Sequence, residues 1–296
     1  MATQNLTLFA DTDCDIRPEV AEEYGYRLIS MPYTIDGKEV FPYETEKTFN
    51  PHAFYDRLRN GDIPKTAGLS PEKYISYFEP ELQKGNDILY VHFSSKLSGT
   101  FNAMNIAIEI LKEKYPERTI HTFDTKAITG LALVILKEIG KLYQEGKSLE
   151  EILDVAENDL VKHYALFAFV DNLKFFKASG RLTGLSATMG TILSVKPIIS
   201  IDDEGRMDAI GKVLGRLPAL KKIMDYMDKL GDDVKNHQIL IVHSDAPELV
   251  VKIVELIHKK YGNDLDLTIE PVNPTAGIHA GPSCLGVIFH SKRRVL

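Results

Sequence analysis

The chain has 296 residues, of which 44% are hydrophobic and 26% charged, with a formal net charge of −7 at pH 7. This composition is typical of a globular protein and argues against a disordered chain or general nucleic-acid binding. The sequence has no apolar run of membrane-span length, no signal-peptide pattern at its start and only two cysteines, Cys14 and Cys284. We therefore expect a cytoplasmic protein without a disulfide framework.

The first half of the chain alternates predicted strands and helices. At 50–51 and 70–71 a residue that commonly caps helices precedes a proline, and Ser148 has capping-box spacing to Glu151. Strands are predicted over 6–10, 27–33, 87–91 and 120–123. Helices are predicted to begin at about 18, 51, 71, 98, 131 and 149. This alternation predicts a largely parallel sheet with helices on its faces.

A tight turn is predicted at Asp36-Gly37, between the short extended runs 33–35 and 38–40. Thr66 is predicted to lie in the loop between two helices. Near Lys162 we place the boundary between two α/β domains, which cover residues 1–162 and 163–296.

The second half is expected to hold a mixed arrangement of strands and helices. Strands are predicted over 165–170, 197–201, 207–210, 238–243, 265–272 and 285–289. Helices are predicted through 175–176 and over 217–230 and 247–261. Residues 202–205 read as a hairpin turn, and 177–181 and 273–283 as loops, the second rich in glycine and proline.

A hydroxyl-rich turn follows the strand over 87–91 and precedes a helix. It carries Ser94, Ser95, Ser98 and Thr100 within seven residues. Free N–H groups at a helix start favour an anion, and uncharged hydroxyls suit a monoanion such as a carboxylate. The alternative is that these residues only cap the helix.

Two further loop residues are candidates for binding an anion. Arg181 follows Ser179-Gly180, and its guanidinium would pair with a carboxylate or phosphate, although a solvated surface arginine is the default. His279 lies in the last long loop, where an imidazole can donate a hydrogen bond or transfer a proton near neutral pH. A merely structural histidine is the alternative.

One enzymatic interpretation also fits several acidic residues. Asp11 and Asp13 after the first strand, Ser94, and the pair at 202–203 resemble in order the motifs of haloacid-dehalogenase-type phosphatases. Asp11 would then be the nucleophile and Asp13 the acid/base, with Mg²⁺ held by the acidic pair. This hypothesis is the alternative to a binding function.

Nearly the whole chain resembles the DegV family of bacterial fatty-acid-binding proteins. The resemblance rests on a series of motifs in order. They are Asp11-Thr12-Asp13, Asp36-Gly37-Lys38, Thr66 with Ser70-Pro71, Ser94-Ser95 with Ser98-Gly99-Thr100, Phe123-Asp124-Thr125, Ser179-Gly180-Arg181-Leu182, Lys196-Pro197-Ile198 and His279 with Gly281-Pro282.

The resemblance implies two α/β domains that enclose a long-chain fatty acid between them. Thr66 and the pair Ser94 and Ser95 would hydrogen-bond the carboxylate, with Arg181 and His279 near it. It further implies that a separate fatty acid kinase subunit phosphorylates the bound carboxylate to an acyl phosphate. This chain would then be a carrier in phospholipid metabolism rather than a catalyst, without a cofactor or metal, in transient contact with a membrane surface and without a nucleic-acid partner.

Overall fold

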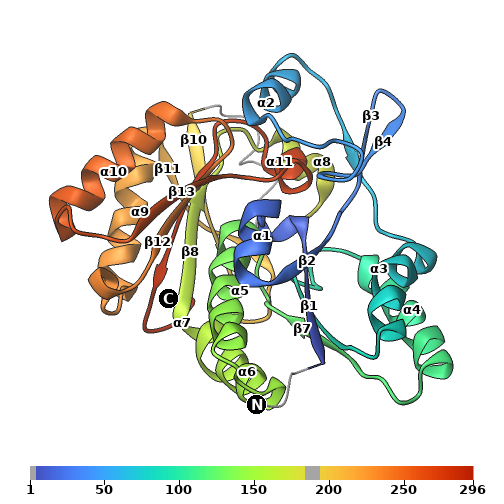
Figure 1. The fold of residues 1–296 in the computed structure, drawn as a ribbon. Coiled ribbons are helices and arrows are strands. Elements are labelled where there is room, and N and C mark those ends of the chain that lie inside the picture. Colours follow the sequence, from blue (N-terminus) through green and yellow to red (C-terminus); the bar gives the residue numbers. More distant parts are fainter. Residues whose placement is uncertain (1–4, 184–193, 296) are drawn as a thin grey trace.

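A computed structural model describes residues 5–183 and 194–295 and contains two α/β domains (Figure 1). Helices flank a parallel sheet in the first domain, and the second is built on a mixed sheet. The predicted fold class is therefore confirmed. The boundary predicted between residues 162 and 163 lies inside the short helix α7 (Val161–His163), directly before the first strand of the second sheet.

The first sheet has four parallel strands in the order β2-β1-β6-β7. Their bounds are Leu6–Asp11 (β1), Tyr26–Ile29 (β2), Asp87–His92 (β6) and Ile120–Asp124 (β7). Every residue of β6 after Asp87 is buried, as its apolar sequence predicts for a strand covered on both faces. Since β1 and β6 run parallel, the turns after Asp11 and His92 meet at one edge of the sheet.

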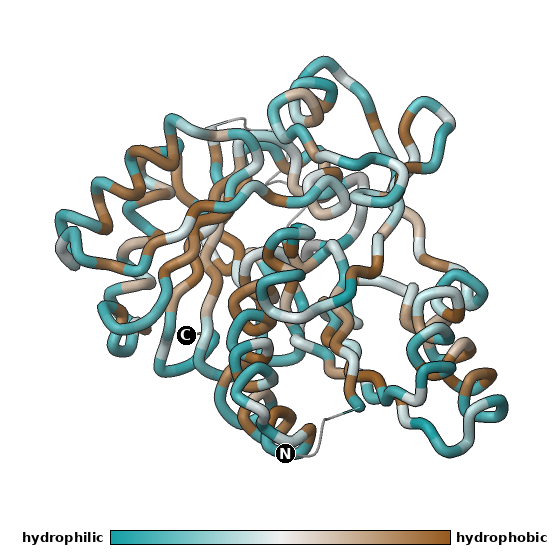
Figure 2. The backbone as a smooth tube through the Cα atoms, viewed as in Figure 1, coloured by the Kyte–Doolittle hydropathy of each residue, from teal (hydrophilic) through white to brown (hydrophobic). Residues whose placement is uncertain are grey.

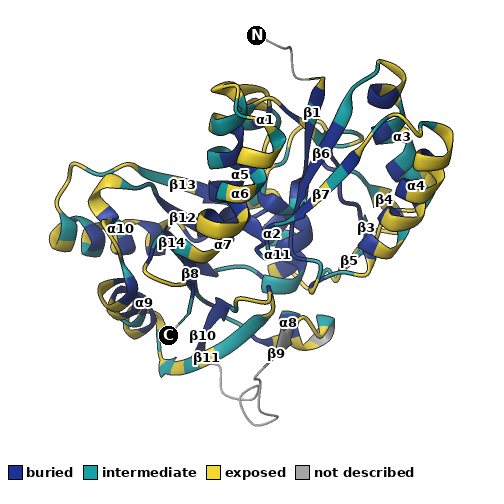
Figure 3. Cartoon of the chain, turned by 90° about the horizontal axis from the view of Figure 1, so that it is seen from below, coloured by how far each residue is buried: buried dark blue, intermediate teal, exposed yellow. Residues whose placement is uncertain are grey.

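Helices α3 and α4 cover one face of this sheet, and α1 and α5 cover the other (Figure 3). The helix bounds are Pro18–Tyr24 (α1), Pro51–Arg59 (α2), Pro71–Gln83 (α3), Thr100–Lys114 (α4), Thr129–Gln144 (α5) and Leu149–Val155 (α6). The side chains of Asn50 and Ser70 cap α2 and α3, and Ser148 forms the predicted capping box with Glu151. A π-helical turn joins α6 to α7, so the predicted amphipathic run after Ser148 is not one regular helix.

Helix α5 is buried on nearly all sides because it packs against both sheets. Residues Thr129–Leu136 are all buried, which matches their almost unbroken apolar sequence. Gly130 lies so close to β12 that a Cβ there would overlap the side chains of Leu240 and Val242. The hydropathy colouring shows apolar residues along this helix and the central strands (Figure 2). Neither α5 nor another helix in the described ranges is long and apolar enough to cross a membrane.

The second sheet has the strand order β13-β12-β14-β8-β10-β11-β9. Its bounds are Tyr164–Phe169 (β8), Leu182–Thr183 (β9), Val195–Ile201 (β10), Met207–Leu214 (β11), Ile239–His243 (β12), Leu267–Pro271 (β13) and Leu285–His290 (β14). The pairs β12–β13 and β9–β11 are parallel and the other pairs antiparallel. Helices α9 (Arg216–Leu230) and α10 (Pro247–Tyr261) pack on the face of this sheet turned away from α5 (Figure 1).

A small third sheet has the order β4-β3-β5 and carries Thr66. Its hairpin, β3 (Tyr33–Ile35) and β4 (Lys38–Val40), turns at Asp36-Gly37 as predicted. Thr66, predicted to lie in a loop, belongs instead to β5 (Lys65–Thr66), because it pairs with Tyr33.

The glycine- and proline-rich segment 273–283 is not the long loop that its composition predicts. It contains helix α11 (Pro274–Ala280). The side chain of Asn273 accepts a hydrogen bond from the backbone N–H of Ala276, and Pro274 takes the first helical position, the same start signal as at 50–51. Gly281, whose positive φ of 75° favours glycine, follows the last turn.

Candidate functional site

A cavity of about 320 Å³ lies between the two domains, and both contribute to its wall. Phe93 and Leu97 from the turn after β6 line one side, and Leu166, Phe169 and Val242 from the second sheet line another. Its size is at the lower end of the usual range for small-molecule sites. The largely apolar wall suits an alkyl chain better than a polar ligand.

Thr66 and His279 form a polar pair in the cavity wall. The distance between Thr66 Oγ1 and His279 Nε2 is 3.1 Å, within hydrogen-bonding range. They lie 213 residues apart in sequence and meet because β5 packs beside α11. His279 occupies the last turn of α11, the helix that replaces the predicted loop.

The imidazole of His279 is neutral at physiological pH. Burial, with a smaller contribution from the positive charge of Arg181, lowers the pKa of His279 to about 4. A neutral imidazole carries one N–H. When that hydrogen is on Nε2, His279 donates to Thr66 Oγ1 and leaves the threonine O–H free to donate to a ligand.

Arg181 also lines the cavity, at its exposed side. Residues 177–179, predicted as loop, are the last turn of α8 (Lys174–Ser179), which ends at Gly180 in a left-handed conformation. Ala67, Gly68 and Gly99 line the cavity too and are exposed. The end of the cavity that carries the polar pair therefore adjoins the protein surface.

Neither Ser94 nor Ser95 is part of the cavity wall in the described residues. Ser94 is fully buried, and its hydroxyl donates to the backbone oxygen of Gly205 at 2.8 Å. The Ser95 hydroxyl donates to a carboxylate oxygen of Asp124 at 2.6 Å. The structure therefore places both serines behind the cavity wall, where they hold the turn after β6 against neighbouring loops.

Ser98 and Thr100 are the two hydroxyl residues of this turn that reach the cavity. The Thr100 hydroxyl bonds the backbone N–H of Leu69 and the hydroxyl of Tyr74. Ser98 Oγ accepts from the backbone N–H of Thr100, which leaves its own hydrogen free to donate. The sequence predicted a helix start at about residue 98, close to the observed start of α4 at Thr100. The hydrophobic pattern did not show which hydroxyl of the turn faces the cavity, so it did not distinguish Ser98 from its neighbours.

The acidic residues do not form the metal site that a haloacid-dehalogenase-type phosphatase requires. Asp11 is fully buried, and its carboxylate accepts from the hydroxyl of Tyr90 and the backbone N–H of Phe93. Burial raises the pKa of Asp11, which opposes its use as an ionised nucleophile. Asp202 caps the β10–β11 turn by accepting from the backbone N–H groups of Glu204 and Arg206.

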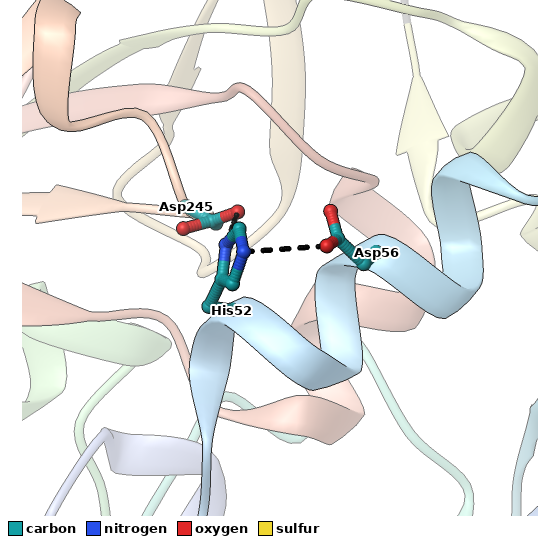
Figure 4. Close-up of side chains that lie close together, drawn as sticks. All are labelled: His52, Asp56 and Asp245. Atoms are coloured by element: carbon teal, nitrogen blue, oxygen red, sulfur yellow. Dashed lines mark hydrogen bonds and ion pairs between the residues drawn. The ribbon is translucent and has the colours of Figure 1, made fainter.

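In the part of the chain that the structure describes, a different group of possible metal ligands lies close together, namely His52, Asp56 and Asp245 (Figure 4). His52 lies 3.0 Å from Asp245 and 3.3 Å from Asp56. Arg59 bonds the same two carboxylates, at 2.7 Å for Asp56 and 2.5 Å for Asp245. Because the Arg59 guanidinium already pairs with both carboxylates and offsets one of their two negative charges, we interpret this group as an ion-pair network that ties α2 to the turn after β12.

Asp15 is a buried carboxyl whose ionisation opposes folding. Its Oδ1 accepts from the backbone and side-chain N–H groups of Asn273, both at 2.8 Å, whereas Oδ2 has no partner in the described part of the chain. Burial raises the pKa of Asp15 from 3.8 to about 8. The folded protein thus holds a proton that the unfolded chain releases, and stability falls as pH rises from about 4 to about 8.

Asp15→Asn should reduce this loss of stability at high pH. Asparagine keeps the acceptor for Asn273, tolerates the left-handed backbone of this position (φ 54°) and cannot ionise. The free energy of unfolding, measured with urea, should fall between pH 5 and pH 9 in both proteins. The fall in Asp15→Asn should be smaller than the fall in the wild type by at least about 1 kcal/mol. Asp233→Asn is the matched control, since Asp233 is also left-handed but exposed. Equal pH slopes for Asp15→Asn and wild type would contradict the prediction.

The fold and the cavity together define a two-domain α/β protein with an apolar cavity between its domains and a polar pair at the exposed end of that cavity. The chain belongs to the DegV family: residues 5–292 match the model of the family described as "Uncharacterised protein, DegV family". A DegV domain-containing protein of Clostridium perfringens is 30% identical over 286 residues, which cover 97% of each chain.

Solved structures share this fold. A Thermus thermophilus protein, described as a DegV family protein that binds fatty acid, superposes with a TM-score of 0.84 at 24% identity, covering 97% of this chain and 99% of its own. A stearic-acid-binding protein of Eubacterium ventriosum gives 0.84 at 20% identity, covering 97% and 98%. DegV of Bacillus subtilis, described as a fatty acid binding protein, gives 0.82 at 22% identity, covering 98% and 100%.

Proposed function

We propose that this protein binds a long-chain fatty acid, with the acyl chain in the interdomain cavity and the carboxylate at Thr66 and His279. The observation that carries the proposal is an apolar cavity whose surface-proximal end presents uncharged hydrogen-bond donors. A carboxylate removed from water must be hydrogen-bonded, and Thr66 and Ser98 can each donate to it. The solved relatives that are described as binding fatty acids support the same ligand class.

In this proposal the predicted residues take different roles. Arg181 lies at the exposed end of the cavity, where its charge attracts the carboxylate. Ser94 and Ser95 keep the turn in place through Gly205 and Asp124 and do not contact the ligand.

We further propose that the protein presents its ligand in the cytoplasm to a separate fatty acid kinase subunit and is not itself the catalyst. The sequence resemblance supports this role, as does the exposed rim at Ala67, Gly68 and Gly99, through which a second protein could reach the carboxylate. Transient contact with a membrane surface would let the acyl chain enter without crossing water. The proposal requires no cofactor.

Mass spectrometry of a lipid extract from the purified protein tests the proposed ligand. The expected result is a long-chain fatty acid at up to one molecule per chain, and rebinding of supplied fatty acid after delipidation. Protein that carries no fatty acid and binds none when supplied would overturn the proposal. A Mg²⁺-dependent phosphatase activity that Asp11→Asn abolishes would favour the enzymatic alternative.

A further inference from the structure

The cavity wall contains a second polar group, separate from Thr66 and His279. Asp13, Thr129 and Thr275 come from three different elements, the 3₁₀ turn Thr12–Cys14, the start of α5 and the first turn of α11. Some of these polar atoms have no partner in the described part of the chain, and an alkyl chain alone would not supply one, so their place in an otherwise apolar wall favours a ligand with a polar substituent.

Asp13 keeps one carboxylate oxygen available to the cavity. Its Oδ1 accepts from the hydroxyl of Thr275, which is 2% exposed. Its Oδ2 has no hydrogen-bonding partner within residues 5–183 and 194–295. The side chain is only partly buried because part of it faces the cavity. A carboxylate oxygen in this position can accept a hydrogen bond from a ligand in the cavity.

Thr129 supplies a second, independent sign of a ligand. It is 8% exposed and lines the cavity, and its hydroxyl has no partner in the described part of the chain. Its backbone has φ 54°, an outlier for a β-branched residue, and such strain is concentrated at ligand sites. Packing alone accounts for neither the unpaired hydroxyl nor the strained backbone.

The two polar groups of the cavity are about one helical turn apart. Thr275 and His279 are four residues apart on α11 and both line the cavity, so they share one face of the helix. The separation along the axis is about 5–6 Å. An extended alkyl chain covers it in about four to five carbon–carbon bonds, each about 1.5 Å long.

We propose that the preferred ligand is a fatty acid that carries a hydroxyl about four to six carbons from its carboxylate, with the hydroxyl donating to Asp13 Oδ2. Thr129 supplies a second polar contact to this hydroxyl. The inference rests on the proposed fatty-acid site and specifies its substrate class. A carboxylate accepts hydrogen bonds but does not donate them, so the site favours a hydroxyl over an oxo group in the same place.

Competition binding with delipidated protein tests this preference. The probes are hexadecanoic acid, its analogues with a hydroxyl on carbon 4, 5 or 6, the matching oxo acids and 16-hydroxyhexadecanoic acid. At least one of the first three hydroxy acids should bind about tenfold more tightly than hexadecanoic acid, and the oxo acids and the 16-hydroxy acid should not. Equal or weaker binding of all three hydroxy acids would overturn the inference. Failure to bind any fatty acid would overturn the proposed function with it.

Two substitutions of Asp13 make the test specific to this residue. Asp13→Leu should bring the ratio of hydroxy-acid to hexadecanoic acid affinity to about one, whatever its absolute affinity for hexadecanoic acid. In Asp13→Asn a neutral amide replaces the carboxylate. Its N–H₂ can donate to an oxo group, and its oxygen accepts from a hydroxyl more weakly than a carboxylate does, so the ratio of hydroxy-acid to oxo-acid affinity should fall at least tenfold. Asparagine matches aspartate in size, so Asp13→Asn should fold. The role of Asp13 can therefore be tested with this variant even if Asp13→Leu does not fold. An unchanged ratio would overturn the assignment to Asp13.

Discussion

Ala168→Phe should nearly abolish binding of long-chain fatty acids. Ala168 lies on β8 and lines the cavity together with Leu166, so a phenyl ring at this position fills space that the acyl chain would occupy. Displacing about four methylene groups at about 0.8 kcal/mol each costs roughly 3 kcal/mol, which is more than a hundredfold in affinity. A fluorescent fatty-acid displacement assay measures this loss directly.

Two controls accompany the Ala168→Phe experiment: a fatty acid with a shorter chain, and a substitution of the neighbouring residue Phe167. Octanoic acid should lose less affinity than hexadecanoic acid, because a short chain leaves part of the cavity free. Phe167→Leu is the matched variant, since Phe167 points to the opposite face of β8 and packs in the core of the second domain. It should lower stability without changing affinity. Full-strength hexadecanoic acid binding by a folded Ala168→Phe protein would place the ligand elsewhere.

His279→Ala is expected to weaken fatty-acid binding about 10- to 100-fold. The substitution removes the partner that orients the Thr66 hydroxyl, and the loss of a hydrogen bond to a charged group costs about 1.5–3 kcal/mol. His279→Gln, which keeps an N–H donor on a flexible side chain, should recover part of the affinity. Isothermal titration with hexadecanoic acid gives both values.

The control for His279→Ala is His258→Ala, on α10 and away from the cavity. It should bind as the wild type does. Because the pKa of His279 is lowered to about 4, the imidazole stays neutral above about pH 5, and its contribution to affinity should be constant from pH 6 to pH 8. A contribution that changes steeply near pH 6.5 would show that His279 titrates in the complex, contrary to this prediction.

Local signals in the sequence were sufficient to predict most elements. The proline starts at 51 and 71, the capping box at Ser148 and the turn at Asp36-Gly37 each depend on a few neighbouring residues, and all are confirmed. Helix α11 was missed because its small residues read as loop. Gly277 is needed there since a Cβ would overlap the ring of Tyr55 on α2, a contact that only the folded chain reveals.

The candidate site could be predicted only in part. The resemblance to the DegV family pointed to Thr66, Arg181 and His279, and the structure brings all three to one cavity. It could not show that Ser94 and Ser95 face neighbouring loops, because their partners, Gly205 and Asp124, are far away in the chain. Nor did it show that Asp13 and Thr275 meet in the cavity wall, since 262 residues separate them.

A crystal structure of the protein with hexadecanoic acid tests the proposed binding mode most directly. The predicted result places a carboxylate oxygen within about 3.2 Å of Thr66 Oγ1. It also places the acyl chain inside the interdomain cavity, in contact with Phe93 and Leu166. A fatty acid bound outside this cavity, or one whose carboxylate lies away from both Thr66 and His279, would contradict it.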